Sequence, residues 1–565
     1  MNRITAFFSL VLFTTSWCRG DQSGILEADV VVYGDAAVGV AAAVQAARMD
    51  KSVILVSQYG HLGGMTSSGL GWTDIGNTRI LGGISREFYH RVYLHYQDDE
   101  AWVLQNREDF RERGQGAPTF DHEAQLGSVF EPRVAERIFD EMVAEAGVTV
   151  VHGRLDLESG TTMDGQRIIK MHLEDGRRIR GKMFIDGSYE GDLMAAAGVT
   201  FTVGREANSK YDETVNGITL PVHQNNITEA VDPYMVPGDP DSGLLPGVNP
   251  YDEADVGKGD HRLQSYCYRV CLTNAPDNMV PISQPEGYDE NDYEILFRAL
   301  EAGYFGQRYD GGRRVVLFKF SPMPNMKTDS NNHGGVSMNL IGGNYSDLPP
   351  DHPDYWDWTT LSHDEREEVA ARHRDWQLGL IWTLQNHPRV PDEVKEDYVG
   401  WGLPKDEFVD NDHWPYNIYV REARRMISDF VMTENQILHN EDHPQVEDSV
   451  GMGAYTMDSH NVQRVVYEGN LRNEGDVQRY IGGRVYPISY KSIVPAVGEC
   501  ENLFVPWCVS ASHIAFGSIR MEPVGMVLGQ SAATAAVLAI DGGLPVQEVD
   551  YDELRERLLA DGQSL

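Results

Sequence analysis

The feature that most constrains the fold is a short glycine-containing turn between a buried strand and an alanine-rich helix. Residues 28–33 (ADVVVY) form an almost continuous apolar run, which is typical of a parallel strand buried on both faces. The turn GDAAVG occupies residues 34–39, and residues 40–49 are rich in alanine, which favours a helix. A second apolar run, residues 52–57 (SVILVS), completes a strand–helix–strand unit. We therefore predict an α/β fold with a Rossmann-like nucleotide-binding domain.

The turn matches a dinucleotide-binding fingerprint in which alanine replaces the second glycine. Gly34 permits the tight turn from strand to helix, and Gly39 lets the helix pack closely on the sheet. The free N–H groups and the positive dipole end of the helix then face a pyrophosphate. The alternative is a strand–helix–strand unit that binds no nucleotide. The residues predicted to contact the pyrophosphate are Gly34, Ala36, Ala37, Val38 and Gly39.

The end of the second strand departs from the fingerprint. An acid is expected there, about 20 residues after the turn, to bind the ribose. Ser57 and Gln58 stand there instead. Either side chain can hydrogen-bond a ribose hydroxyl, although less strongly than a carboxylate.

A second glycine-rich segment, residues 60–69 (GHLGGMTSSG), follows this strand. A flavin dinucleotide is a long ligand that needs a second stretch of close backbone contact, so the segment favours FAD over NAD. A plain surface turn is the alternative. For His61, a covalent link to the flavin and a hydrogen-bonding or packing role both stay open. The residues predicted to contact FAD here are His61, Gly63, Gly64 and Met65.

Three segments resemble a family of bacterial FAD-dependent oxidoreductases, many of them secreted, within the glutathione-reductase-like flavoprotein group. Residues 30–74 are similar to the opening of that family. Residues 183–198 (MFIDGSYEGDLMAAAG) and 510–536 (SASHIAFGSIRMEPVGMVLGQSAATAA) resemble its later flavin-contacting segments. The resemblance covers nearly the whole mature chain and implies FAD-dependent redox chemistry. It also implies cofactor contacts at Asp186, Gly187 and Gly525.

Two residues near the C-terminal end of the chain are the candidate catalytic groups. His513 follows an expected strand at 502–509, and ligands bind at strand ends in doubly wound sheets. Its imidazole is suited to accept a hydroxyl proton while hydride leaves for FAD, and the alternative is a structural histidine near the flavin. Arg520 precedes the segment that the resemblance places near the isoalloxazine, where it would stabilise the reduced flavin or anchor a substrate carboxylate. His333 and His413 are the next candidates.

The middle of the chain has a different composition, rich in Asp, Asn, Pro, Trp and Tyr. Residues 327–334 (KTDSNNHG) and 412–416 (DHWPY) are polar clusters that suit a hydroxylated ligand such as a sugar, and solvated loops are the alternative. Arg269 is expected to pair with a substrate or with a buried acid. Helices are expected at 365–385 and 422–431.

These observations divide the chain into segments. Residues 154–182 are predicted to form a β-meander, with a hairpin turn at Asp175-Gly176. The large middle segment is predicted to be an inserted α+β substrate or cap domain. The predicted order is a signal peptide (1–20), the first part of the FAD-binding domain (27–205), the substrate or cap domain (206–480), the second part of the FAD-binding domain (481–545) and a C-terminal tail (546–565).

Charge and targeting signals limit location and partners. The net charge is 47 − 86 = −39, which repels nucleic acid and anionic membranes. Arg3 and the apolar run 6–17 predict a secretory signal, and hence a secreted or periplasmic protein. No later segment has about 18 uninterrupted apolar residues, so no membrane span is expected. No metal is expected either, since the remaining cysteines lack metal-ligand spacing. Buried thiols are predicted, with one cross-strand disulfide left open, at Cys267, Cys271, Cys500 and Cys508.

The predicted function is FAD-dependent removal of hydride from a C–H bond of a small, hydroxylated, carbohydrate-like substrate. Two alternatives stay open: a redox-neutral flavoprotein that acts by transient oxidation, and a non-catalytic carbohydrate-binding protein on an FAD fold. The electron acceptor is likewise left open.

Overall fold

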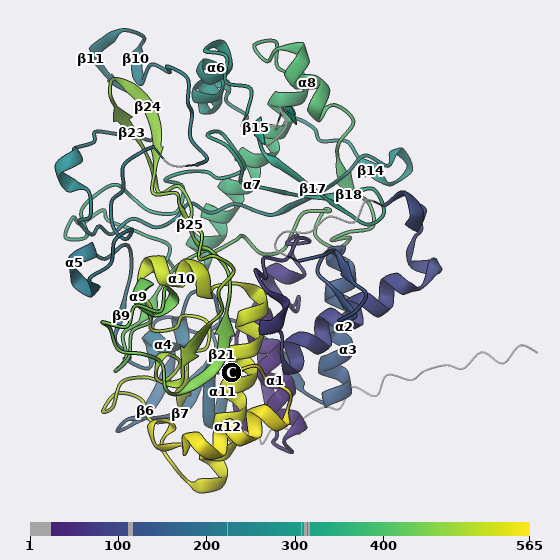
Figure 1. Ribbon diagram of the computed structural model, residues 1–565, viewed down its shortest axis with the longest axis vertical. Coiled ribbons are helices and arrows are strands. Elements are labelled where there is room, and N and C mark those ends of the chain that lie inside the picture. Colours follow the sequence, from purple (N-terminus) through teal and green to yellow (C-terminus); the bar gives the residue numbers. More distant parts are fainter. Residues whose placement is uncertain (1–23, 111–116, 223, 307, 310–312, 315–316) are drawn as a thin grey trace, which may run out of the picture.

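The computed structural model describes residues 24–110, 117–222, 224–306, 308–309, 313–314 and 317–565. The predicted signal peptide at 1–20 lies outside these residues. Figure 1 shows that the N-terminal and C-terminal segments lie together in the lower half of the molecule. The teal middle of the chain forms the upper half.

A seven-stranded sheet forms the centre of the lower half. Its order is β5-β2-β1-β8-β7-β6, and β27 pairs with β8. The strand–helix–strand unit is confirmed, because β1 pairs in parallel with both β2 and β8. The meander is confirmed by the antiparallel pairs β6–β7 and β7–β8. The strands are β1 (Ile25–Tyr33), β2 (Val53–Ser57), β5 (Thr149–His152), β6 (Thr161–Asp164), β7 (Arg167–His172), β8 (Arg178–Asp186) and β27 (Leu503–Phe504).

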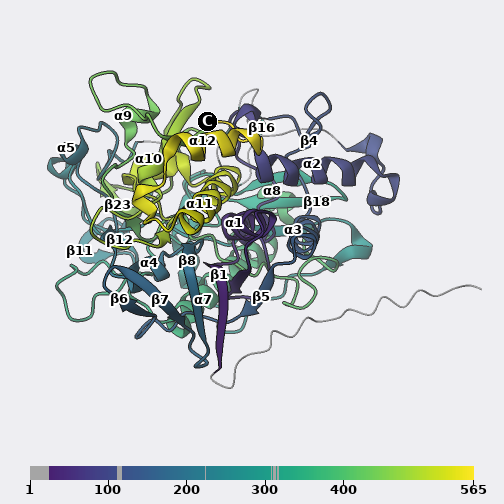
Figure 2. The same ribbon diagram turned by 90° about the horizontal axis from the view of Figure 1, so that it is seen from below.

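Helices from both ends of the chain cover one face of this sheet. Figure 2 shows α1, α3 and α11 side by side above the strands, with α2 and α12 outside them. The contact between α1 and α11 is close: a Cβ at Gly529 would lie 2.2 Å from the Val38 carbonyl oxygen. The helices are α1 (Ala37–Arg48), α2 (Gly83–Gln97), α3 (Pro132–Ala146), α4 (Asp192–Ala196), α10 (His513–Ile519), α11 (Glu522–Gly542) and α12 (Tyr551–Ala560).

Helix α11 is long and apolar enough to cross a membrane by length and composition alone. However, 89% of its most apolar window is buried inside the protein. Its apolar residues therefore form core contacts with α1 and the sheet. It is the one such helix among the described residues.

The middle of the chain is built from small sheets and one long helix. Helix α7 (His363–Asn386) begins at a capping box in which Ser362 and Glu365 satisfy each other's backbone N–H groups, and it confirms the helix expected at 365–385. A three-stranded sheet has the order β13-β18-β17. Its strands are β13 (Val270–Thr273), β17 (Lys319–Met323) and β18 (Lys327–Asn331).

The remaining elements of this region are short. The helices are α5 (Asn208–Tyr211), α6 (Glu294–Glu301), α8 (Asp392–Tyr398) and α9 (Glu434–Ile437). The strands include β9 (Phe201–Thr202), β10 (Tyr234–Val236), β11 (Asp239–Leu244), β12 (Val248–Asn249), β14 (Met279–Val280), β19 (Leu403–Pro404), β20 (Arg425–Met426), β21 (Ser449–Gly453), β22 (Met457–Ser459), β23 (Gln463–Tyr467), β24 (Asn470–Glu474), β25 (Val477–Arg479) and β26 (Tyr486–Ser489).

Two expected elements are wrong. The helix expected at 422–431 is absent, and strand β20 pairs there with β9. Arg425 is fully buried and bonds to Glu206 and Glu422, so tertiary ion pairs override local helix propensity. The strand expected at 502–509 is only Leu503–Phe504, because the chain leaves the sheet directly after it.

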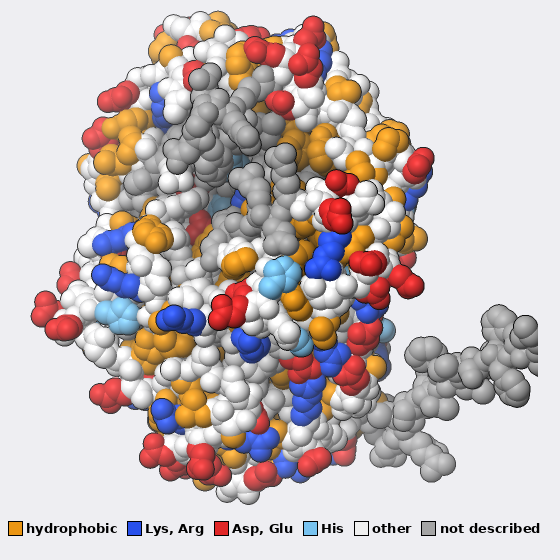
Figure 3. All heavy atoms as spheres, turned by 45° about the vertical axis from the view of Figure 1, so that its right-hand side comes forward, with side chains coloured by type: hydrophobic (Ala, Val, Ile, Leu, Met, Phe, Trp, Pro, Cys, Tyr) orange, Lys and Arg blue, Asp and Glu red, His pale blue; other side chains and the backbone are white. Residues whose placement is uncertain are grey.

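The four predicted cysteines are buried and free, which confirms the buried-thiol prediction and leaves no disulfide among them. Acidic side chains are spread over the face that Figure 3 shows and do not gather in one patch.

Candidate functional site

The N-terminus of α1 is an uncapped helix end at the carboxyl edge of the sheet. Ala36 precedes the helix, no described side chain caps it, and its first turn holds no acid. A Cβ at Gly34 would lie 2.5 Å from the Ser188 backbone nitrogen, and one at Gly39 would lie 2.1 Å from the Gly34 carbonyl oxygen. Only glycine fits at these two positions, so backbone N–H groups are exposed at the N-terminus of α1. This arrangement fits the pyrophosphate of a dinucleotide.

The second glycine-rich segment closes onto this turn. Gly63 forms a parallel bridge with Ala36, and its N–H donates to the Asp35 carbonyl oxygen at 2.7 Å. Gly63 and Gly64 both have positive φ, 103° and 53°. A Cβ at Gly64 would lie 2.3 Å from the Tyr189 hydroxyl oxygen and 2.9 Å from the Ala36 Cα. The structure therefore brings together the two glycine segments that the sequence assigned to one cofactor.

A buried carboxyl group, which the sequence analysis missed, joins three segments at this place. The Tyr189 hydroxyl donates to Glu522 Oε1 at 2.8 Å, and the Thr66 hydroxyl donates to Oε2 at 2.9 Å. The Met65 N–H donates to the same Tyr189 hydroxyl at 2.8 Å. Burial raises the pKa of Glu522 to about 7. The signal was an acid directly before Pro523, at the start of an otherwise apolar helix.

Asp186 and Gly187, which the resemblance implied as cofactor contacts, make different contacts from each other within the protein. A Cβ at Gly187 would lie 2.8 Å from the Gly39 Cα, so this glycine permits the contact between β8 and α1. The Asp186 carboxyl group accepts hydrogen bonds from Ser188 and from the Met194 N–H. Burial raises the pKa of Asp186 to about 6. Its side chain stabilises its own turn, and its contact with the cofactor stays a prediction.

The other predicted cofactor residues lie around the same edge. His61 Nδ1 lies 3.0 Å from Glu136 Oε1, Nε2 lies 3.2 Å from the Ser67 carbonyl oxygen, and the ring stacks on Tyr416 at 4.1 Å. Both ring nitrogens are engaged, which supports the hydrogen-bonding and packing role over the covalent one. A Cβ at Gly525 would lie 2.8 Å from the Trp507 ring, so this glycine permits close packing at the start of α11.

Ser57 and Gln58 lie at the end of β2, as predicted, but both side chains are engaged by the protein. The Ser57 hydroxyl donates to Asp35 Oδ2 at 2.7 Å and accepts from the Gly60 N–H at 3.0 Å. The Gln58 amide donates to the Tyr33 hydroxyl. Neither side chain is therefore free to take the full role of the missing acid.

A small polar cavity lies between Asp74, which follows the second glycine-rich segment, and residues of the middle of the chain between 224 and 478. Its volume is about 70 Å³. Arg520, two residues before α11, donates to the Tyr419 hydroxyl at 2.8 Å and to the Asp458 carbonyl oxygen at 2.9 Å. We call it the polar cavity; its lining is Asp74, Gln224, Asn225, Arg269, Lys319, Asn331, Asn332, His333, Tyr419, Tyr455, Asp458, His460 and Gln478.

The polar cavity has hydrogen-bonding capacity that the protein leaves unused. Oδ1 of Asp458 and Oδ1 of Asn331 are buried and have no hydrogen-bond partner within the described chain. Asp458 Oδ2 lies 3.6 Å from His460 Nε2 and 3.9 Å from Arg520 Nη2. His460, Arg520 and Arg421 together hold the pKa of Asp458 below its usual range against the opposing effect of burial. The cavity thus offers an ionised carboxylate with one open oxygen.

The candidate catalytic residues are divided between the cavity and other places. Arg520 contacts two lining residues, and His333 lines the cavity, where burial and Lys319 lower its pKa to about 4. His513 does not line it: Nδ1 lies 2.7 Å from Glu422 Oε2, and its backbone N–H donates to Glu206. Burial, with Arg425 and Arg205, lowers the pKa of His513 to about 3. These contacts favour the structural alternative for His513.

Arg269 and His413 lie in different surroundings. Arg269 lines the cavity, but its guanidinium forms a two-pronged pair with buried Asp329, which is the buried-acid alternative. His413 lies apart from the cavity, with Nδ1 3.1 Å from the Glu407 carbonyl oxygen. The cluster 412–416 lies at another pocket, which Trp414, Pro415 and Tyr416 help to line.

Comparison with solved structures gives partial likenesses. The L-amino acid deaminase from Proteus vulgaris is 15% identical, with 32% of this chain and 53% of that chain covered and a TM-score of 0.22. L-proline dehydrogenase from P. horikoshii is 14% identical, with 32% and 59% covered and a TM-score of 0.22. The 3-ketosteroid-delta4-(5alpha)-dehydrogenase from Rhodococcus jostii RHA1 is 17% identical, with 30% and 48% covered and a TM-score of 0.19. The chain thus spans about half the length of each.

No curated protein matches the chain. A family model described as FAD dependent oxidoreductase matches residues 29–558, which include the sheet from Asp29 onward, both glycine segments and α11. The chain therefore belongs to the FAD-dependent oxidoreductase family and is an enzyme whose cofactor is FAD.

Proposed function

We propose that this enzyme oxidises a small hydroxylated, carbohydrate-like substrate that binds in the polar cavity. The observation that carries the proposal is the open Oδ1 of Asp458, beside Arg520 and the start of α11. An ionised carboxylate with a free oxygen accepts a hydrogen bond from a substrate hydroxyl. The amide side chains of Asn331, Asn332 and Gln478 around it both donate and accept, as a polyol requires.

Within this proposal each side chain has a distinct task. FAD, when bound, accepts a hydride equivalent from the substrate carbon. Asp458 accepts the hydroxyl proton, and His460 orients the carboxylate, since Asn332 donates to its Nδ1 at 2.8 Å and leaves Nε2 facing Asp458. Arg520 holds positive charge at the start of α11, where it favours an anion. His333 is the second candidate acceptor.

The proposal replaces His513 by Asp458 as the main proton acceptor. Exchange with a substrate hydroxyl requires a group that reaches the cavity, and Asp458 lines it. His513 instead has its Nδ1 on Glu422 and is 2% exposed.

A substrate panel tests the function. The purified holoenzyme is mixed anaerobically with sugars, sugar alcohols, amino acids and steroids, and the loss of the flavin absorbance near 450 nm is followed. We expect bleaching by members of the sugar and polyol sets. Bleaching by amino acids or steroids alone would overturn the substrate class and leave the oxidoreductase assignment intact. Turnover of a sugar without net bleaching would support the redox-neutral alternative.

The domain organisation, the wider protein group and the location of this enzyme are also proposed, mainly from the sequence. Residues 206–480 act as the substrate or cap domain, supported by the number of lining residues that they contribute to the polar cavity. Membership in the glutathione-reductase-like group is supported by the resemblance of residues 183–198 and 510–536. Secretion is supported by residues 1–20, and N-terminal sequencing of the native protein tests it, with cleavage expected after Gly20.

A further inference from the structure

A second pocket lies at the carboxyl ends of β2 and β5. Its volume is about 470 Å³. Gln58 and Tyr59 follow β2, Arg154 follows β5, and the opposite wall comes from α7 and from residues 410–418. In parallel nucleotide-binding sheets the adenosine half of the ligand lies beyond the end of the second strand. We call this site the aromatic pocket.

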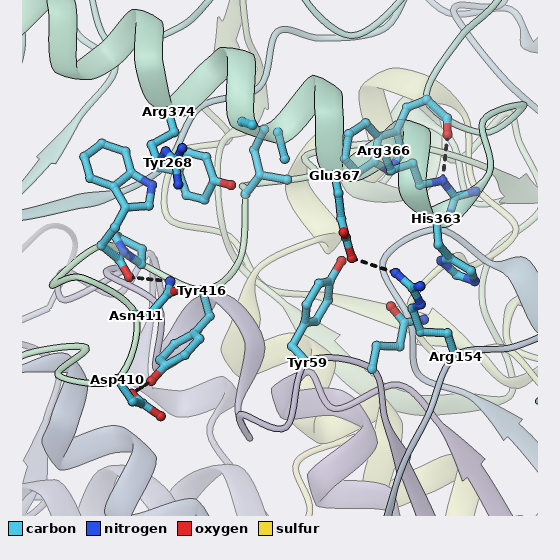
Figure 4. Close-up of a pocket in the computed structure, with 17 residues that line it drawn as sticks. Tyr59, Arg154, Tyr268, His363, Arg366, Glu367, Arg374, Asp410, Asn411 and Tyr416 are labelled. Carbon is cyan, nitrogen blue, oxygen red and sulfur yellow. Dashed lines mark hydrogen bonds and ion pairs between the residues drawn. The ribbon is translucent and has the colours of Figure 1, made fainter. Parts of the chain in front are cut away.

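The walls of the aromatic pocket have the chemistry of a base-stacking site. Figure 4 shows Tyr59 and Arg154 both pointing toward Glu367 of α7, with Tyr416 on the other side of the opening. Arg154 pairs with Glu367 at 2.6 Å. Tyr268 packs edge-to-face on Trp414 at 5.3 Å between ring centres. Aromatic faces and a guanidinium group bind the flat face of a purine.

A carboxylate reaches this place from an unexpected position in the chain. Asp35 belongs to the turn after β1, but its Oδ2 accepts from the Ser57 hydroxyl at 2.7 Å and from the Tyr59 N–H at 3.1 Å. It is therefore held at the end of β2. Ser57 is small enough to leave room for it, whereas a glutamate at 57 would bring a second negative charge to the same spot.

The Asp35 carboxyl group is buried and held by hydrogen bonds from Ser57 and Tyr59. It is 4% exposed, and no basic side chain in the described part of the chain forms an ion pair with it. Burial raises its pKa, against the opposing effect of its hydrogen bonds to Ser57 and Tyr59. A buried carboxyl group held only by neutral donors is stabilised by further hydroxyl donors, and a ribose carries two of them.

We propose that Asp35 supplies the ribose-binding carboxylate that the end of β2 lacks, and that the aromatic pocket, which Tyr59 helps to line, holds the adenine ring of FAD. The carboxylate has moved from the second strand to the glycine turn, while its position in space is kept. The proposal rests on the FAD cofactor and is independent of the substrate proposed for the polar cavity.

The test compares FAD with FMN, which has the same isoalloxazine but no adenosine. Dissociation constants of both are measured by flavin fluorescence on the deflavinated full-length protein. Asp35→Asn removes the charge and keeps the shape, so FAD binding should weaken at least about tenfold, as for a hydrogen bond to a charged group. FMN binding should stay within about twofold.

A relocation variant makes the test specific. Asp35→Ala should weaken FAD like Asp35→Asn, and the double variant Asp35→Ala/Ser57→Glu returns a carboxylate to the end of β2. Recovery of most of the FAD affinity in the double variant supports the proposal. Equal weakening of FAD and FMN, or unchanged FAD affinity in Asp35→Asn, overturns it.

The adenine part has its own variant and control. Tyr59 is 45% exposed, so Tyr59→Ala is expected to fold. It should weaken FAD about tenfold, the loss of one stacking contact, without changing FMN affinity. The matched control is Tyr480→Ala, a tyrosine that is 77% exposed and outside the pocket, which should leave both affinities unchanged. If Tyr59→Ala binds FAD as the control does, the pocket does not hold the adenine.

Discussion

The two ends of strand β18 lie in two buried polar clusters that differ in one respect. At its start, Lys327 Nζ bonds to Glu131 at 2.8 Å, Asp406 at 2.9 Å and Glu407 at 2.5 Å. At its end, Asn331 lines the polar cavity with its Oδ1 unpartnered. Both clusters mix acids and bases, and Asn331 lies only four positions after Lys327.

The difference separates a structural cluster from a ligand site. The three carboxylates around Lys327 are spaced as metal ligands would be, but the ammonium group bonds to all of them. The cluster joins the start of α3 to β18 and needs nothing more. In the polar cavity the protein does not satisfy every hydrogen-bonding group, since Asp458 and Asn331 each keep an oxygen without a partner. Leftover hydrogen-bonding capacity, and not polarity itself, marks the place where a ligand is expected.

The largest expected effect comes from breaking the complete cluster. Lys327→Met removes the buried cation that bonds to all three carboxyl groups and leaves them only the partly exposed Arg133, so the free energy of unfolding should fall by about 3–5 kcal/mol. Urea denaturation measures it. The folded fraction should still reduce its flavin at the wild-type rate. An unchanged urea midpoint would mean that water solvates the carboxyl groups of this cluster. It would then not be a structural cluster, and the distinction from the polar cavity would be wrong.

The next effect concerns the open carboxylate in the cavity. Asp458→Asn should slow flavin reduction by about 100-fold or more while keeping full flavin content, because a general base contributes roughly 10²–10⁴-fold. Stopped-flow absorbance under anaerobic conditions measures the rate. Asp442→Asn, on the surface, is the control. A wild-type rate in Asp458→Asn would transfer the role to His333.

His513 lies in a third buried polar cluster, with Glu206 and Glu422. Its pH dependence tests whether this cluster is structural, like the one around Lys327, or a ligand site, like the polar cavity. The pKa of His513 falls from 6.5 to about 3 in the folded protein, so the unfolded chain takes up the proton first as the pH falls. Stability is therefore lost below about pH 6.5, by about 2 kcal/mol between pH 7 and pH 5.

Replacing this histidine should remove that dependence. His513→Gln should lose about 2 kcal/mol less than wild type between pH 7 and pH 5 in urea titrations, with flavin reduction near normal. His443→Gln, at a partly exposed histidine, should keep the wild-type pH dependence. If flavin reduction in His513→Gln is instead a hundredfold slower, His513 takes part in catalysis.

The smallest effect is expected at the unpartnered amide. Asn331→Ala removes an oxygen that has no protein partner, so stability should change little. The KM of the substrate identified in the panel should rise about 2- to 10-fold, the value of one neutral hydrogen bond. Steady-state kinetics and a urea titration measure the two quantities. A loss of stability with unchanged KM would contradict the assignment of this oxygen to a ligand.

The cofactor half of the molecule was predictable because its signals are local. The strand, the turn at 34–39, the helix and the glycine segment at 60–69 lie within about forty residues, and each has a spacing with one physical meaning. The cluster 327–334 was only half predictable. Its composition suggested a ligand, but only tertiary partners decide that Lys327 is satisfied and Asn331 is not.

The rest depends on contacts between distant residues. Asp458 and Glu522 have no local motif, and their roles appear only when segments far apart in the chain meet. Residues 421–425 (REARR) have high helix propensity, but buried charge pairs hold them extended. Asp35 had the appearance of an ordinary turn residue, and the missing acid was sought at 57 and 58 because sequence spacing does not show where a side chain reaches.

The packing of α11 on α1 has a consequence for the order in which the protein is made. The two helices lie 522 − 48 = 474 residues apart in the chain, and Gln45 donates to Thr534 across their contact at 3.1 Å. At roughly 5–20 residues per second, synthesis takes about 25–95 seconds to cover that interval. During that time the apolar surface of α1 that packs on α11 in the finished protein is not yet covered. A chain that stops before α11 should therefore be held by chaperones or degraded, and shortening the protein from its C-terminal end should not yield a smaller flavoprotein.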